Sequence, residues 1–313
     1  MAPTTNGGTE FDPAALARTE ARFWREIWDA APAAVAVAKG ARRAEFGPVQ
    51  ATVIAALPEV RMLNLILGAA GVDAAAEGFV EEAVNWVRDQ DVRGFALLEP
   101  GAADAACAEP GPSSTECAEP GATGAPPAKG ALTGARAAEA ALTRAGYEKG
   151  YDWMRFVRDA HPPRFEVAED VEVVELDGSD EDAPFGSIAA LGFGLPAWVA
   201  SLFAPLPALP DWRCYLALSG GEPQACAAML LDGEVAELGI AATLEGGRRR
   251  GCQLALLRRR IEDAAAAGVR TLFVETGARV PGRPSTSYAN ILRAGFEEAY
   301  LCPGWIDARP AAG

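Results

Sequence analysis

The stretch Gly246–Arg260 is GGRRRGCQLALLRRR, which places six arginines within thirteen positions of a chain whose formal net charge is −15. The run before it, VAELGIAAT, alternates as a strand does. Leu254 and Leu257 are spaced like the buried face of a helix. The stretch therefore predicts a glycine-rich turn between a strand over 234–243 and an amphipathic helix over 251–267.

Such a turn can bind an anion, because the first amides of a helix lack partners within it and the helix dipole is positive there. The arginines at 248–250 would add charge-assisted hydrogen bonds to a phosphate. We interpret the later trio, 258–260, as a solvent-exposed helix face, from which one side chain could still reach a phosphate. The spacing from Gly246 to Gly251 half-matches a nucleotide-triphosphate loop. The Lys and the Ser or Thr that this loop needs next are missing, which argues against an ATPase or a kinase.

The composition bounds the class of protein. The chain has 43 acidic and 28 basic residues, which argues against general binding to nucleic acid or to an anionic membrane and favours a cationic substrate. We find no run of about 18 apolar residues and no secretory signal pattern, so we expect a cytoplasmic protein. The six cysteines form no CxxC pair and the chain has one histidine, which argues against a metal site.

The length of 313 residues favours two domains. The double proline in VRDAHPPR predicts a boundary between a domain over 1–160 and a second domain over 164–313. A run rich in Ala, Gly and Pro over 101–135 is expected to be an insertion or a lid. The octapeptide RAGYEKGY at 144–151 is echoed by RAGFEEAY at 293–300, which indicates two related halves.

The second half is predicted to be mixed α/β, with a meander of three strands broken by the turn residues SGGEP and DG. The strands expected in this half are 165–176, 212–219, 223–231, 234–243, 270–276 and 297–303, and a second helix is expected at 286–294. In the first half we expect helices over 14–29 and 75–90, and strands near 43–57, 61–69 and 93–98.

The arginine stretch resembles the pyrophosphate loop of the GCN5-related N-acetyltransferase (GNAT) superfamily. That pattern is Arg/Gln-x-x-Gly-x-Gly/Ala between the fourth strand and the third helix, and residues 248–253 fill it with Gln253 where Gly or Ala is usual. TLFVETG and SxxNxxRxGF then match the usual fifth strand and fourth helix, so the resemblance covers about 165–305. The first half has LILGAAGVDAAAEG where an arginine loop would stand and looks like a degenerate copy.

The resemblance implies two tandem α/β (α+β) domains, each a mixed, mostly antiparallel sheet flanked by helices, with acetyl-CoA bound to the second and no metal. The pyrophosphate would lie on the amides of 249–253, and the pantetheine arm would pair with strand backbone. The implied cofactor-binding residues are Ala241, Ala242, Thr243, Arg248, Arg249, Arg250, Gly251, Cys252, Gln253 and Asn290. Ser287 is either a helix cap or a cofactor contact.

Amine acetylation needs a base that takes a proton from the amine. Glu237 stands fourteen residues before Gly251, where the histone-acetyltransferase branch of the superfamily has its general base, and a carboxylate on an apolar strand suits that role. The alternative is a strand-face glutamate turned to solvent or paired with an arginine. Glu275 could bind the substrate or act as a base through water, or it could be structural. Tyr288 is the candidate for the acid that protonates the CoA thiolate. The alternative is that Tyr288 is a packed aromatic residue and that water protonates the thiolate.

The leading hypothesis is an acyltransferase that moves an acetyl group from acetyl-CoA to the amine of a small molecule. An alternative is a non-catalytic regulatory module that binds acyl-CoA. A third reading, acetylation of a peptide N-terminus or a lysine, would need an open groove between the halves. The sequence leaves open whether the chain is a monomer or a homodimer.

Overall fold

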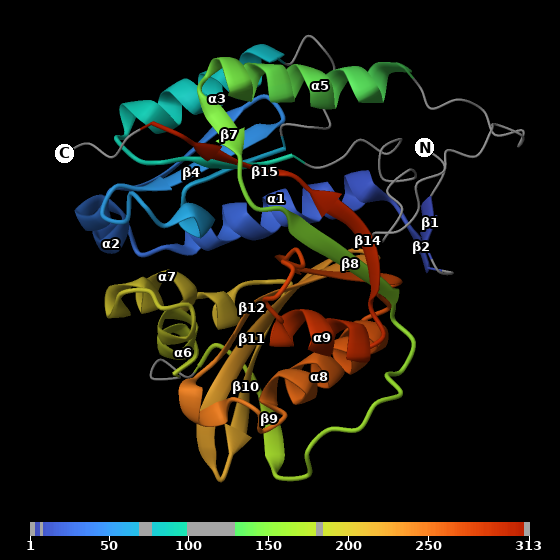
Figure 1. Ribbon diagram of the computed structural model, residues 1–313. Coiled ribbons are helices and arrows are strands. Elements are labelled where there is room, and N and C mark those ends of the chain that lie inside the picture. The colour runs from blue at the N-terminus through green and yellow to red at the C-terminus, as the bar shows by residue number, and fades with distance from the viewer. Residues whose placement is uncertain (1–3, 7–8, 69–76, 99–128, 180–183, 310–313) are drawn as a thin grey trace, which may run out of the picture.

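The computed structural model describes residues 4–6, 9–68, 77–98, 129–179 and 184–309. Two large mixed sheets with helices on their outer faces form the body, as Figure 1 shows, so the α/β (α+β) class is confirmed. Residues 101–128 of the expected insertion lie outside the described residues. The remainder of it, 129–135, is helical instead, because helix α5 (Lys129–Arg144) begins there.

The sheet of the second half has seven strands in the order β14-β8-β13-β12-β11-β10-β9. They are β8 (Trp153–Asp159), β9 (Val171–Leu176), β10 (Trp212–Ser219), β11 (Glu222–Asp232), β12 (Val235–Thr243), β13 (Thr271–Gly277) and β14 (Glu297–Cys302). Only β12 and β13 are parallel neighbours. Helices α8 (Cys252–Ala266) and α9 (Thr286–Arg293) cover one face, and α6 (Phe185–Gly192) and α7 (Ala200–Phe203) lie on the other (Figure 1).

The sheet of the first half has six strands in the order β3-β4-β5-β6-β15-β7. They are β3 (Ala41–Phe46), β4 (Val49–Ile54), β5 (Leu65–Leu67), β6 (Phe95–Leu97), β7 (Tyr147–Lys149) and β15 (Gly304–Asp307). Helices α3 (Glu77–Asp89) and α5 pack on its outer face, and β5 and β6 are its parallel pair. A short hairpin, β1 (Thr4–Asn6) and β2 (Thr9–Phe11), and helix α2 (Ala33–Lys39) complete the half.

The two halves exchange strands across the boundary that the sequence places at 160–164. Strand β8 precedes that boundary but lies between β13 and β14 of the second sheet. Strand β15 is the last strand of the described residues but lies between β6 and β7 of the first sheet. The exchanged segments also run beside each other, because the Gly150 amide donates to the Gly304 carbonyl at 2.8 Å. Neither sheet is therefore complete without the other half.

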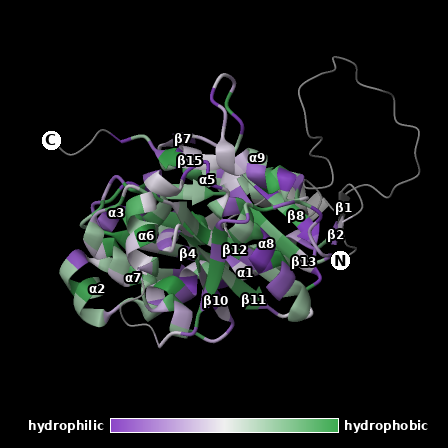
Figure 2. Cartoon of the chain, turned by 90° about the horizontal axis from the view of Figure 1, so that it is seen from below, coloured by the Kyte–Doolittle hydropathy of each residue, from purple (hydrophilic) through white to green (hydrophobic). Residues whose placement is uncertain are grey.

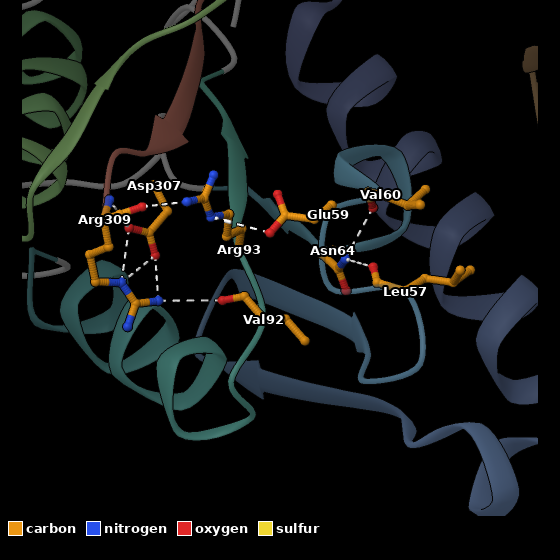
Figure 3. Close-up of polar contacts among 8 residues, drawn as sticks. All are labelled: Leu57, Glu59, Val60, Asn64, Val92, Arg93, Asp307 and Arg309. Atoms are coloured by element: carbon orange, nitrogen blue, oxygen red, sulfur yellow. Dashed lines mark hydrogen bonds and ion pairs between the residues drawn. The ribbon is translucent and has the colours of Figure 1, made fainter. Parts of the chain in front are cut away.

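Polar side chains around β15 fasten the exchanged strand to the first half, as Figure 3 shows. Arg309 pairs with Asp307 at 2.5 Å, and the Asp307 carboxylate is fully buried. Arg93 donates to the carbonyl of Arg309 at 2.7 Å and faces Glu59 at 3.4 Å. Asn64 closes the loop before β5 by donating to two carbonyls, one of them that of Leu57 at 2.8 Å.

Helix α1 (Pro13–Ala30) joins the halves, because it belongs to the first but packs on β12 of the second. It starts where Asp12 accepts a hydrogen bond from the Ala14 amide at 3.0 Å. The apolar side chains of its buried face lie in the largest hydrophobic cluster. Arg22 anchors it to the second half by ion pairs with Asp211, in the turn before β10, at 2.7 Å and with Asp232, the last residue of β11, at 2.9 Å. Figure 2 shows the hydrophobic colour concentrated on the strands beneath such helices.

The expected elements of the second half are confirmed within a few residues, except that β9 starts at Val171 rather than at 165. The expected strand over 43–57 is two strands joined by a tight turn at Gly47. Each octapeptide of the internal echo is the end of a helix, a left-handed glycine (Gly146 at φ 73°, Gly295 at φ 82°) and the start of a strand. Within the described ranges, no helix is long and apolar enough to span a membrane.

Candidate functional site

Strands β12 and β13 diverge at their carboxyl ends. Their pairing stops at Leu238 and Val274, although β12 continues to Thr243. A bulge on β12 accompanies this divergence, since the register against β11 shifts there and Ile240 has φ 44°. The divergence leaves backbone of β12 without a β13 partner, beside the turn that leads into α8.

The turn into α8 has the backbone of an anion cradle. Arg249 (φ 62°) and Gly251 (φ 85°) are left-handed, and α8 starts directly after them without a side-chain cap. A Cβ on Gly251 would stand 3.0 Å from the Cβ of Ala168, so the chain approaches closely there. With no cap, the first amides of α8 stay available to an anion.

A cavity of about 1290 Å³ opens at this turn. Its cationic side chains are the exposed Arg248–Arg250 and Arg293, and it also holds the acidic Glu166, Asp170 and Glu245. The other residues that line it are Val167, Ala168, Thr243, Gly247, Gly251, Cys252, Gln253, Leu254, Thr286 and Asn290. Eight of the ten expected cofactor-binding residues therefore surround one cavity, whereas Ala241 and Ala242 do not line it.

Gln253 ties the start of α8 to α9. Its side-chain amide donates to Ser287 Oγ at 3.1 Å, and Asn290 donates to its Oε1 at 2.8 Å. Ser285, not Ser287, caps α9, because its hydroxyl accepts from the Tyr288 amide. The glutamine that departs from the usual loop pattern thus uses its side chain to fix one wall of the cavity.

Cys252 contributes backbone rather than a thiol. Its side chain is buried, at 1% exposed, and burial raises the pKa of the thiol. The arginine at 250 opposes that shift but does not reverse it. A nucleophilic thiolate at this position is therefore disfavoured.

The second arginine trio is not a solvent-exposed face, which corrects the sequence interpretation. Arg260 is 1% exposed and donates to the carbonyls of Ala228 at 3.0 Å and Leu256 at 3.2 Å, and burial lowers its pKa to about 10. Arg259 pairs with Glu175 of β9 at 2.9 Å. Arg258 donates to the Phe165 carbonyl. All three hold α8 in place, and none lines the cavity.

Glu237 and Glu275 lie on one face of the sheet, beneath α1. Glu237 pairs in register with Phe273, and Glu275 follows two residues later, so both side chains point to the same side. Glu237 is 2% exposed, which excludes the alternative of a solvent-facing residue, whereas the Glu275 side chain is 15% exposed. Glu275 contacts Arg155 at 2.5 Å, and Arg155 contacts Glu20 of α1, also at 2.5 Å.

Tyr288 lies on the opposite face of the sheet. Its ring packs edge-on against Phe156 at 4.7 Å between centroids, and the Arg279 guanidinium covers it. Its hydroxyl donates to Glu298 at 2.6 Å. Burial, together with that carboxylate, raises the pKa of the phenol. Tyr288, Glu237 and Glu275 do not line the large cavity.

The sequence reasoning missed two buried charges of this region, Glu20 and Arg155. A signal was present for Glu20, because it shares the helical face of Leu16 and Phe23. No such signal exists for Arg155, because the strands that pair with its own strand lie more than 100 residues later in the sequence. Among the described residues, no group of three or more His, Cys, Asp or Glu could hold a metal ion.

The fold is that of GNAT proteins in tandem, as comparison with solved structures shows. A GCN5-related N-acetyltransferase from Kribbella flavida has a TM-score of 0.52 at 17% identity, over 86% of this chain and 90% of its own. A GCN5-related N-acetyltransferase from Sphaerobacter thermophilus has a TM-score of 0.55 at 14% identity, over 85% of this chain and 78% of its own. A tandem GNAT protein from the clavulanic acid biosynthesis pathway has a TM-score of 0.52 at 14% identity, over 84% of this chain and 79% of its own. No protein-family model and no curated protein matches the chain.

Proposed function

We propose that the chain is an acyltransferase that takes an acetyl group from acetyl-CoA and transfers it to the amine of a small molecule. One observation carries the proposal: a cavity of about 1290 Å³ opens on an uncapped helix start, with left-handed Arg249 and Gly251 and exposed arginines beside it. This is the donor set that a pyrophosphate requires. The GNAT fold, shared over both halves, agrees with it.

The amides of 251–253 and the side chains of Arg248 and Arg250 would hold the phosphates. The backbone of Ala241–Thr243, beyond the divergence of β12 and β13, would align the pantetheine arm. When bound, acetyl-CoA would supply an acyl group activated as a thioester. Gln253 and Asn290 would keep the wall between α8 and α9 fixed.

The base in this proposal is a glutamate under α1. Glu275 is preferred, because it stands where the two strands have diverged and keeps an exposed fraction that Glu237 lacks. It would take the proton from the amine, and water would protonate the leaving thiolate. Glu237 is the second candidate. Glu275→Gln is expected to lower kcat by about 100-fold with unchanged acetyl-CoA affinity. Glu237→Gln is expected to lower kcat less. Single-turnover kinetics would compare the two variants.

The proposed compartment of the protein is the cytoplasm. The thiols of Cys214, Cys226 and Cys252 are free and buried, which suits a reducing environment. A cationic acceptor remains part of the proposal, supported by the acidic composition.

The first test is calorimetric titration of acetyl-CoA into the wild type and Gly251→Glu. A glutamate there would add a negative charge at the cradle and force a left-handed backbone on a side chain. Gly268→Glu is the matched control, since Gly268 ends the same helix with φ 82° and no described atom lies within 4 Å of its Cβ position. Binding by wild type and control but not by Gly251→Glu supports the site.

The non-catalytic alternative is tested by measuring both binding and thiol release with the same wild-type protein. A regulatory module would bind acetyl-CoA at this site but release no thiol with any amine. Free thiol would therefore be assayed across polyamines, aminated sugars and amino acid amides. No binding by the wild type would overturn both versions.

A further inference from the structure

A buried guanidinium links the two halves beside the proposed base. Arg155 is 1% exposed, and its two terminal nitrogens contact different carboxylates, Nη1 that of Glu275 and Nη2 that of Glu20, each at 2.5 Å. Its plane also packs over the Phe273 ring at 5.5 Å. The planar fork of arginine fixes both carboxylates at once, which a lysine could not do.

Arg155, which contacts Glu275, and Glu20, which contacts Arg155, both come from the first half of the chain. Arg155 reaches Glu275 because β8 is an exchanged strand and pairs with β13, so that Arg155 and Glu275 are register partners. Glu20 reaches Arg155 because α1 crosses the face of the second sheet. The Glu20 side chain is 2% exposed, so this contact has no competing water from the bulk.

Arg155 is shared between two carboxylates, Glu275 and Glu20. Arg155 on β8 supplies one positive charge, whereas Glu20 on α1 and Glu237 on β12 share that sheet face with Glu275 itself. From β14, Tyr300 adds a phenol, because it is the other register partner of Arg155. One cation thus serves at least two carboxylates. Glu20 therefore draws on the charge that would otherwise hold Glu275 in its ionised, weakly basic form.

We propose that Glu20 and Arg155 are positioning residues for Glu275, so that the first half completes the site of the second. Arg155 orients the Glu275 carboxylate, and Glu20 orients Arg155 and offsets its charge. The first half thereby has a task in the reaction. This inference rests on the proposed function, in which Glu275 is the base.

The test compares Glu20→Gln with Glu26→Gln. Glutamine keeps a hydrogen-bonding side chain at position 20 and removes only the charge. Glu26 is the matched control, because it lies on the same helix and also joins the halves, accepting from Trp212 Nε1 at 2.6 Å, but it pairs with Arg22 and not with Arg155. The probe is ¹³C NMR of carboxyl-labelled glutamate, in which the Glu275 signal is the one lost in Glu275→Gln.

Removing the Glu20 charge is expected to lower the midpoint of the Glu275 titration by about one pH unit. The control should leave it in place. In turnover, the acidic limb of the pH–kcat profile should move the same way, kcat at neutral pH should fall about threefold, and KM for acetyl-CoA should stay constant. A purely structural contact would change the melting temperature without moving the midpoint or the limb.

The outcomes separate the two proposals. An unmoved Glu275 midpoint in Glu20→Gln overturns the positioning role whether or not the protein turns over. A moved midpoint in a wild type that releases no thiol with any amine overturns the proposed function and leaves the electrostatic link standing. Arg155→Lys gives a second check: it keeps the charge but not the fork, so kcat should fall at least tenfold at unchanged acetyl-CoA affinity, and equal kcat would count against the role.

Discussion

The Tyr288 hydroxyl donates to Glu298 Oε1 across 2.6 Å, on the face of the sheet opposite Glu275. A phenol that already donates to a carboxylate, beneath the Arg279 guanidinium, is held as a packing element of α9. This arrangement favours the packing alternative over the acid for Tyr288. In the proposed reaction, water would then be the proton source for the thiolate.

Tyr288→Phe is accordingly expected to keep kcat within about threefold and to lower the free energy of unfolding by about 2 kcal/mol, the usual contribution of a hydrogen bond to a charged group. Stopped-flow thiol release and urea unfolding would measure the two effects. A 100-fold loss of kcat with normal stability would instead make Tyr288 the acid.

The two arginine trios are expected to behave differently. Arg248→Ala should weaken acetyl-CoA binding roughly tenfold, more steeply at low salt, with little change in melting temperature, because its side chain is exposed. Arg260→Met should leave the affinity unchanged and lower the melting temperature, because it removes a buried hydrogen bond to the Ala228 carbonyl. Equal effects of both variants on affinity would contradict the assignment of the anion site.

Cys252→Ala is expected to keep both acetyl-CoA affinity and turnover within about twofold, because the backbone and not the thiol is used. Burial raises the pKa of this thiol, so iodoacetamide at pH 8 should label it slowly in the folded protein and fully after unfolding. Mass spectrometry of the peptide would follow the labelling. An inactive alanine variant would revive a covalent thiol mechanism.

Glu297→Gln is expected to stabilise the protein at neutral pH. Burial, and the charge of Asp159, raise the pKa of Glu297 above its ordinary 4.5. A carboxyl whose pKa is higher in the folded than in the unfolded state destabilises the fold once pH rises above the unfolded value. Scanning calorimetry should thus show a higher melting temperature for the variant at pH 7 and no difference at pH 3.5. A gain at both pH values would point to packing instead.

The local elements could be predicted because their patterns are local. Helix α8 is marked by the period of its leucines, and the β10–β12 meander by its turn residues. Of the residues that line the cavity, 248–253 could be predicted from one motif. Arg260 was misjudged, although it lies three residues after Leu257 and four before Ala264, on the buried face. Because Arg260 belongs to a run of three arginines, its helical spacing from Leu257 and Ala264 is easily overlooked.

The strand exchange and the Glu20–Arg155–Glu275 contact could not be predicted. They depend on pairing between segments more than 100 residues apart, for which no local period exists. The double proline after residue 160 marks a real end of a strand. It does not show which sheet that strand completes.

The place of β15 in the first sheet also matters while the chain is being made. β7 is synthesised before the seven strands of the second sheet, and its neighbour β15 only after them. At typical elongation rates the delay is on the order of ten seconds or more. For that time β6 has an edge with no strand to cover it, and open edges recruit other chains. A nascent chain would therefore depend on chaperones, or on a slow late closure, to avoid aggregation at the Phe95–Leu97 edge.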